Sequence, residues 1–112
     1  MCTEADINRM TREIVAAYRS AYGDALKAVY LYGSYARGEQ TEESDVDYAA
    51  IVQGERLPLQ QKLSLVWDRS AEIGLDYDVV ISPTVIPYDE FLTHQNTLPY
   101  YRNILTEGQQ VG

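Results

Sequence analysis

Two short stretches of this sequence carry residue types that suit phosphate and a divalent cation. Gly33 and Ser34 form the first stretch, and Asp45 and Asp47 form the second, with ten residues between the two. If the aspartates open a strand, their side chains point to one face with Cα atoms roughly 6–7 Å apart. Like charges at that spacing repel each other, and a divalent cation relieves the repulsion. Mg²⁺ suits such a place because it prefers one or two carboxylates combined with substrate phosphates.

The residues around the glycine–serine pair could hold those phosphates. Gly33 lets the backbone approach a ligand closely, and the N–H groups after it, with the Ser34 hydroxyl, could bind phosphate oxygens. Arg37 carries a guanidinium that matches phosphate geometry, although it could instead pair with a neighbouring glutamate. Ser44 is a further candidate contact to the nucleotide, or else a turn-forming hydroxyl. Together these residues predict a site for a metal-bound nucleoside triphosphate.

Other known phosphate-binding and metal-binding motifs do not match the sequence. Gly33 and Gly38 have the spacing of the two P-loop glycines, but Glu39 and Gln40 stand where that motif requires lysine and serine or threonine. The chain has one histidine and one cysteine, too few for a zinc site of these ligands. The paired aspartates therefore remain the strongest candidate for metal binding.

The hydrophobic pattern predicts the elements that position these residues. We expect helices over 3–21, 58–73 and 98–107, and strands over 25–32, 46–52 and 77–82. Residues 33–43 are expected to form a loop with room for one helical turn, and 83–96 an irregular segment. Thr3 is a suitable N-cap, and Gly23, Gly74 and Gly108 are placed to end the three helices.

Connection lengths predict the topology. About 11 residues join the first two strands, too few for a parallel crossover, so we expect an antiparallel pair. A full helix joins the second and third strands, which allows a parallel, right-handed crossover. The expected fold class is α/β (α+β), a small mixed sheet of three or more strands packed by helices in the order α-β-β-α-β-α. In it, the candidate residues meet at one edge.

The composition narrows the function classes. The chain has 112 residues, 46% of them hydrophobic, and a formal net charge of −8, so we expect one acidic domain over 1–112. Such a surface argues against direct nucleic-acid binding and suits a basic protein partner. No apolar run reaches about 18 residues and the N-terminus does not look like a signal peptide, so we expect no membrane association and a cytoplasmic protein.

The motif resembles that of a known superfamily. Residues 33–38 followed by 44–47 resemble the G-S-x10-D-x-D signature of the DNA polymerase beta-like nucleotidyltransferases. The fuller string GSYARGEQTEESDVDYAAIV is similar to minimal nucleotidyltransferases, the MNT antitoxins of HEPN/MNT toxin–antitoxin pairs. Residues 98–108 also resemble the C-terminal helix of that group, and the whole resemblance runs from about 28 to 108.

The resemblance implies the nucleotidyltransferase fold and a metal site with three carboxylates. Asp45 and Asp47 match the paired aspartates that bind two Mg²⁺ ions, and a third carboxylate comes from the next core strand in the family. Asp78 is the best match for the third carboxylate, and Asp76, two residues earlier on the same face, is the rival. Asp78 would ligate one ion and accept the proton of the acceptor hydroxyl.

The resemblance also implies the substrates. The phosphate-binding glycine and serine of the family match Gly33 and Ser34, and the role of Tyr35 stays open. The donor would be ATP, and the acceptor a tyrosine hydroxyl of a HEPN-family RNase toxin that forms a hetero-oligomer with this chain. Attachment of AMP would neutralise the toxin.

Two other functions stay open at this point. A small-molecule nucleotidyltransferase of the aminoglycoside type usually needs a further domain to shape its acceptor site, so 112 residues favour an acceptor brought by a partner. A non-enzymatic antitoxin would inhibit by binding alone, and the presence of all three aspartates argues against it.

Overall fold

The computed structural model describes residues 2–42 and 44–112. Glu43, in the expected loop, lies outside the described residues. The elements in chain order are α1 (Glu4–Tyr22), the 3-10 turn η1 (Gly23–Ala25), β1 (Leu26–Tyr32), α2 (Ser34–Arg37), β2 (Val46–Val52), α3 (Arg56–Tyr77), β3 (Ile81–Pro87), α4 (Tyr88–His94), α5 (Pro99–Glu107) and β4 (Gln109–Gln110).

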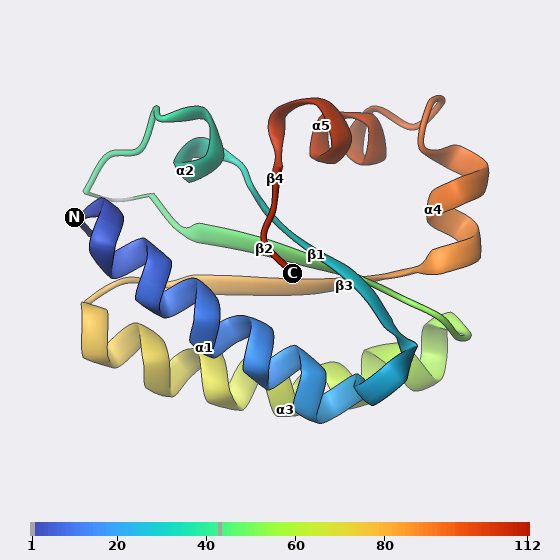
Figure 1. Ribbon diagram of the computed structural model, residues 1–112, viewed down its shortest axis with the longest axis horizontal. Coiled ribbons are helices and arrows are strands. Elements are labelled where there is room, and N and C mark those ends of the chain that lie inside the picture. Colours follow the sequence, from blue (N-terminus) through green and yellow to red (C-terminus); the bar gives the residue numbers. More distant parts are fainter. Residues whose placement is uncertain (1, 43) are drawn as a thin grey trace.

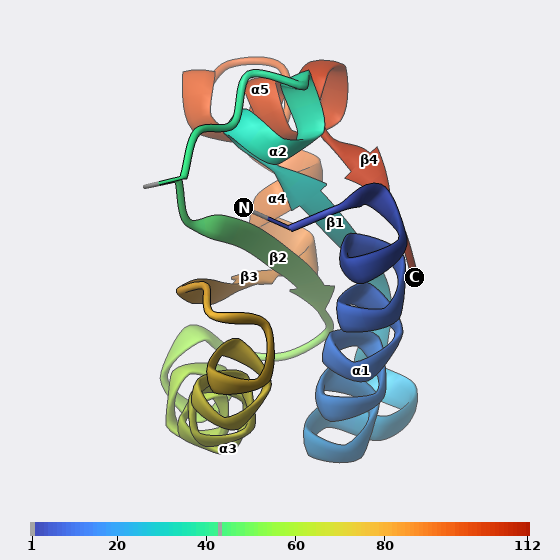
Figure 2. The same ribbon diagram turned by 90° about the vertical axis from the view of Figure 1, so that its left-hand side faces the viewer.

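The four strands form one mixed sheet in the order β3-β2-β1-β4. β1 and β2 are antiparallel with Tyr32 opposite Asp47, and β2 and β3 are parallel with Asp47 opposite Ser82. Both pairings are as predicted, and the fold class is confirmed. Helices α1 and α3 cover one face of the sheet, and α2, α4 and α5 lie toward the other (Figures 1 and 2).

Alternation along β2 divides the core between the two faces. Val46, Tyr48, Ala50 and Val52 join the larger cluster, which includes buried residues of α1 and α3. Ala49 and Ile51 join a smaller cluster with Phe91, Tyr101 and Ile104 of α4 and α5. By the same alternation Asp47, near the start of β2, belongs to the face of the sheet that carries the smaller cluster. In the described part of the chain, no helix has the length and apolarity needed to cross a membrane.

The N-terminal helix begins and ends where its sequence predicts. The Thr3 hydroxyl accepts a hydrogen bond from the Asp6 N–H at 3.1 Å, and the Asp6 carboxylate accepts one from the Thr3 N–H, which completes a capping box. Gly23 ends the helix with φ 58°. The buried Tyr18 hydroxyl donates to the Thr84 carbonyl at 2.8 Å and fixes α1 against the sheet.

The predictions of a strand over 77–82 and an irregular segment over 83–96 are wrong. α3 continues past Gly74, where a Cβ would lie 2.5 Å from the Val79 carbonyl oxygen. Gly74 therefore permits close packing and does not end the helix. β3 contains Pro83 and Pro87, which an edge strand tolerates because one side of it needs no ladder hydrogen bonds.

Candidate active site

Gly33 and Asp47 are in direct contact at the end of the β1–β2 pair. Asp47 lies opposite Tyr32, the last residue of β1, and Gly33 follows with φ 75° and ψ −155°. An ideal Cβ added to Gly33 would collide with the Oδ2 atom of Asp47. Glycine is therefore required both for its backbone conformation and for the space that the Asp47 carboxylate occupies.

Asp47 is the electrostatic centre of the site. Burial raises the pKa of its half-buried carboxyl, the neighbouring Asp45 charge raises it further, and Arg37 opposes both. Asp45 is exposed and lies just before the first residue of β2. Two carboxylates whose repulsion is already felt in the pKa of one of them form a donor set that a divalent cation stabilises. We call Asp45 and Asp47 the acid pair, and this pair therefore fits Mg²⁺.

Arg37 ends the single turn of α2 and faces a hollow beside Gly33. Its Nε donates to Glu39 at 3.1 Å, and its Nη1 pairs with Glu107 of α5 at 3.5 Å. The hollow has a volume of about 210 Å³ and is lined by Tyr32, Gly33, Arg37, Tyr100, Asn103 and Glu107. The predicted ion pair of Arg37 with a neighbouring glutamate thus exists, and Arg37 lines this hollow together with Gly33, the residue that contacts Asp47.

Helix α5 supplies residues of this hollow that the sequence analysis missed. Tyr32 and Tyr100 have hydroxyl oxygens 3.0 Å apart, and their rings meet edge to face. The prediction of a C-terminal helix was correct, but its place beside α2 (Figure 2) depends on contacts between distant parts of the chain. No spacing in the sequence signals that proximity.

The remaining residues of the glycine–serine loop have different surroundings. Ser34 opens α2 and is partly exposed. The Ser44 hydroxyl accepts a hydrogen bond from the Thr41 N–H at 2.9 Å, and the Ser44 N–H donates to the Thr41 carbonyl at 3.1 Å. Ser44 therefore closes a turn just before the acid pair. Tyr35 is buried and belongs to the larger core cluster, which gives it a packing role.

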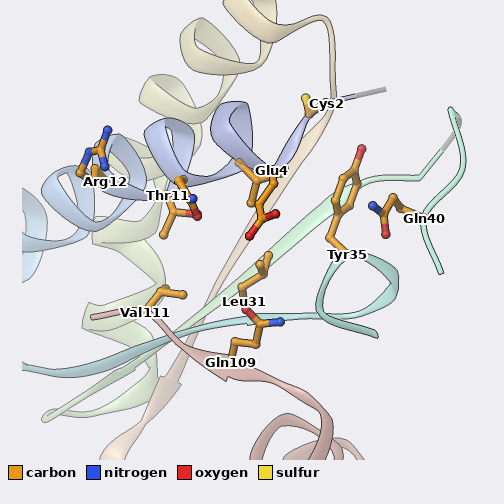
Figure 3. Close-up of a pocket in the computed structure, with 11 residues that line it drawn as sticks. Cys2, Glu4, Thr11, Arg12, Leu31, Tyr35, Gln40, Gln109 and Val111 are labelled. Atoms are coloured by element: carbon orange, nitrogen blue, oxygen red, sulfur yellow. The ribbon is translucent and has the colours of Figure 1, made fainter. Parts of the chain in front are cut away.

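A hollow of about 570 Å³ is separate from the acid pair. It lies between α1, β1 and β4 and contains Tyr35 and Gln40 from the loop and Glu4 and Thr11 from α1 (Figure 3). None of the predicted metal or phosphate ligands lines it. The candidate site is therefore identified by its chemistry and not by the size of its cavity.

Asp78 lies close to Asp45 but not on a strand. It caps the C-terminus of α3 in the left-handed conformation, with φ 55°, and its rival Asp76 lies exposed in the last turn. Asp78 and Asp45 line one hollow of about 280 Å³. Opposite Asp47 on β3 stands Ser82. Over residues 2–42 and 44–112, no three acidic, histidine or cysteine side chains are gathered closely enough to hold a metal ion.

Comparison with known proteins gives the family. The family described as "Polymerase beta, Nucleotidyltransferase" matches residues 13–108, a span that includes every predicted site residue. The chain belongs to the polymerase beta nucleotidyltransferase family. The expected enzyme class, a nucleotidyltransferase, is therefore confirmed.

Two relatives of this nucleotidyltransferase come from Methanocaldococcus jannaschii. "Putative protein adenylyltransferase MJ0604" is 33% identical over 98 residues, which cover 88% of this chain and 90% of the relative. "Putative protein adenylyltransferase MJ1379" is 31% identical over 86 residues, which cover 76% of this chain and 84% of the relative. In each comparison the match therefore covers most of this chain and most of the relative.

Solved structures share the fold of this nucleotidyltransferase. A toxin–antitoxin crystal structure with AMP-PNP matches with a TM-score of 0.59 at 20% identity, covering 89% of this chain and 70% of the other. A structure of a tri-AMPylated Shewanella oneidensis HEPN toxin in complex with an MNT antitoxin matches with a TM-score of 0.50 at 16% identity, covering 91% and 68%. The expected resemblance to MNT antitoxins thus holds at the level of the fold.

Proposed function

We propose that this nucleotidyltransferase is an antitoxin that transfers AMP from ATP to a tyrosine hydroxyl of a HEPN-family RNase toxin in a Mg²⁺-dependent reaction. The observation that carries the proposal is the Asp47 carboxylate, which is repelled by Asp45 and packed on Gly33, a residue that lines a hollow together with Arg37. The names of the relatives and the toxin–antitoxin neighbours support the donor and the acceptor class.

The residues divide the binding of ATP between them. Asp45 and Asp47 would hold Mg²⁺, and Asp78, which lines a hollow with Asp45 but is not grouped with the pair, would have to move closer to become a further ligand. Ser34 and the backbone after Gly33 would bind phosphate oxygens, and Arg37 would exchange its glutamate partners for phosphate. Bound magnesium supplies charge neutralisation on the phosphates and on the departing pyrophosphate.

The transfer itself forms one P–O bond and breaks another. The tyrosine oxygen attacks the α-phosphorus of ATP, and pyrophosphate leaves with the electron pair of the broken bond. The phenol proton passes to a carboxylate, a role that we assign to Asp78 because it lines one hollow with Asp45 and is exposed. Positioning and charge stabilisation provide most of the acceleration in such a site.

Substitution of the acid pair tests the proposal. Radiolabelled ATP, Mg²⁺ and the proposed acceptor, a HEPN-family RNase toxin, are incubated with wild type, Asp45→Asn or Asp47→Asn. We expect the rate of label transfer to fall by at least ~10³, which corresponds to about 4 kcal/mol of barrier, with the fold retained. The matched control is Asp68→Asn, which removes an exposed carboxylate of α3 and should leave the rate unchanged. Transfer by the acid-pair variants at the wild-type rate would refute the mechanism.

A second function, inhibition by binding alone, is favoured by two observations. Asp45, Asp47 and Asp78 are not gathered into a single group, and the strand position opposite Asp47 is a serine. An antitoxin of this kind would silence the HEPN protein without ATP, and the Asp45→Asn and Asp47→Asn variants would silence it as well as the wild type.

A further inference from the structure

The face of α3 beside the acid pair carries an apolar groove. We call it the α3 groove and define it by Trp67, Ala71, Leu75, Val79 and Val80, which line a hollow of about 330 Å³. Leu75 is 83% exposed, Val80 59% and Trp67 46%. Three large apolar side chains this exposed in one hollow are typical of a surface that binds another molecule.

A buried hydroxyl lines the same groove. Ser70 is 1% exposed, and its Oγ has no hydrogen-bond partner within the described structure. Buried polar atoms are normally paired, because an unpaired one loses its hydration without compensation.

The α3 groove continues into the acidic hollow of the candidate active site. Leu75, Val79 and Val80 line both spaces, and the second space holds Asp45 and Asp78. A molecule in the groove therefore extends to the metal-binding pair without leaving the surface.

The hollows on the two sides of the acid pair differ in the charge of their lining residues, and this difference indicates which ligand each side binds. The hollow next to the α3 groove contains Glu42, Asp45 and Asp78, and none of its described lining residues is basic. On the Gly33 side the charged lining residues are Arg37 and one carboxylate, Glu107. A triphosphate is attracted to the arginine side and repelled by the three carboxylates, so the acidic side is left for the acceptor.

We propose that the α3 groove docks the acceptor protein, through a segment that places an apolar side chain between Trp67 and Leu75 and a lysine or arginine in the acidic hollow, close to the acceptor tyrosine. This inference rests on the proposed function and specifies how its acceptor is recognised. Because the groove lies across β2 from the phosphate side, donor and acceptor approach the acid pair from opposite directions.

Site-specific photocross-linking tests the docking surface directly. p-Benzoylphenylalanine is incorporated at position 75 or, as a matched control, at position 57, an exposed leucine in the first turn of the same helix. Each protein is irradiated with the proposed acceptor, a HEPN-family RNase toxin, without nucleotide or metal. We expect cross-linking from position 75 at least about tenfold above position 57, to a peptide that contains lysine or arginine near the acceptor tyrosine.

Kinetics provide a second readout. Leu75→Asp should raise the KM for the HEPN acceptor at least about tenfold while kcat at saturating acceptor stays within about twofold, and Leu57→Asp should change neither. Equal cross-linking from both positions, a cross-link to a second copy of this chain, or a cross-linked segment without basic residues would overturn the proposal. Since cross-linking needs no transfer, it can succeed where AMP transfer fails, and the two claims fail separately.

Discussion

Three influences act on the ionisation of the Asp47 carboxylate, and one of them opposes the other two. Burial and the Asp45 charge favour its neutral form, while Arg37 favours the charged form that a metal requires. Contact with Gly33 leaves no room for a side chain at position 33. Such a carboxylate costs stability in the free protein, which is typical of a group kept for binding or catalysis.

Replacement of Asp47 should make the metal-free protein more stable at neutral pH. The folded-state pKa of Asp47 is raised, so its contribution to stability is fully present below the ordinary aspartate pKa and is lost as the pH rises through the raised value. Asp47→Asn removes that loss. In EDTA we expect a melting temperature higher by roughly 2–4 °C at neutral pH, and a difference that shrinks toward zero below about pH 3.9. Thermal melts across this pH range that show a lower or pH-independent stability would contradict the assignment.

Gly33 can be tested against a glycine of similar backbone conformation. Gly33 and Gly38 have φ of 75° and 73°, but an added Cβ meets Asp47 only at Gly33 and finds open space at Gly38. Alanine at either position should cost on the order of 1 kcal/mol in unfolding free energy, because of backbone strain. Only Gly33→Ala should also displace Asp47, and we expect it to slow AMP transfer at least ~10²-fold while Gly38→Ala stays within a few-fold. Equal rates for the two variants, measured with labelled ATP, would show that Gly33 has only a backbone role.

At the scale of elements, the sequence correctly predicted the strand and helix bounds that depend on neighbouring residues. The hydrophobic run over 46–52 predicted β2 with its observed bounds, and the i, i+2 spacing predicted that Asp45 and Asp47 share a face. The capping residue Thr3 correctly predicted the start of α1. Gly74 was misread because its function is the close approach of the Val79 carbonyl, a contact formed only after the chain turns at Asp78. The start of β3, and with it the place of the third carboxylate, could not be predicted for the same reason.

Helix α5 should compete with the nucleotide for Arg37. Glu107 pairs with Arg37 at 3.5 Å in the hollow beside Gly33, where a phosphate would need the same guanidinium. Glu107→Gln should therefore tighten ATP binding roughly 2–5-fold, the modest effect expected of an exposed charge pair. The control is Glu72→Gln, which removes an exposed carboxylate that pairs with Arg69 on α3. Titration calorimetry that shows weaker or unchanged binding for Glu107→Gln would indicate that Arg37 does not receive the phosphates.

At the scale of the whole molecule, the sheet separates two chemically different approaches to one acid pair. The side of Gly33 and α5 offers a guanidinium and aromatic rings, and the side of α3 offers apolar side chains beside carboxylates. The net charge of −8 predicted a basic partner in general terms, but the α3 groove was invisible in the sequence. In the sequence Leu75 and Val80 are typical helix and strand residues, and their exposure becomes clear only in the folded structure.

The persistence of toxin inhibition after separation tests the central claim most directly. The HEPN protein is incubated with this chain, ATP and Mg²⁺, then separated from it under denaturing conditions, refolded, weighed by intact mass spectrometry and assayed for RNA cleavage. The proposed function predicts a protein that is heavier by an AMP group on tyrosine and remains inactive, and an unmodified, active protein when Asp47→Asn replaces the wild type. Recovery of full RNase activity at unchanged mass after incubation with the wild type would contradict it.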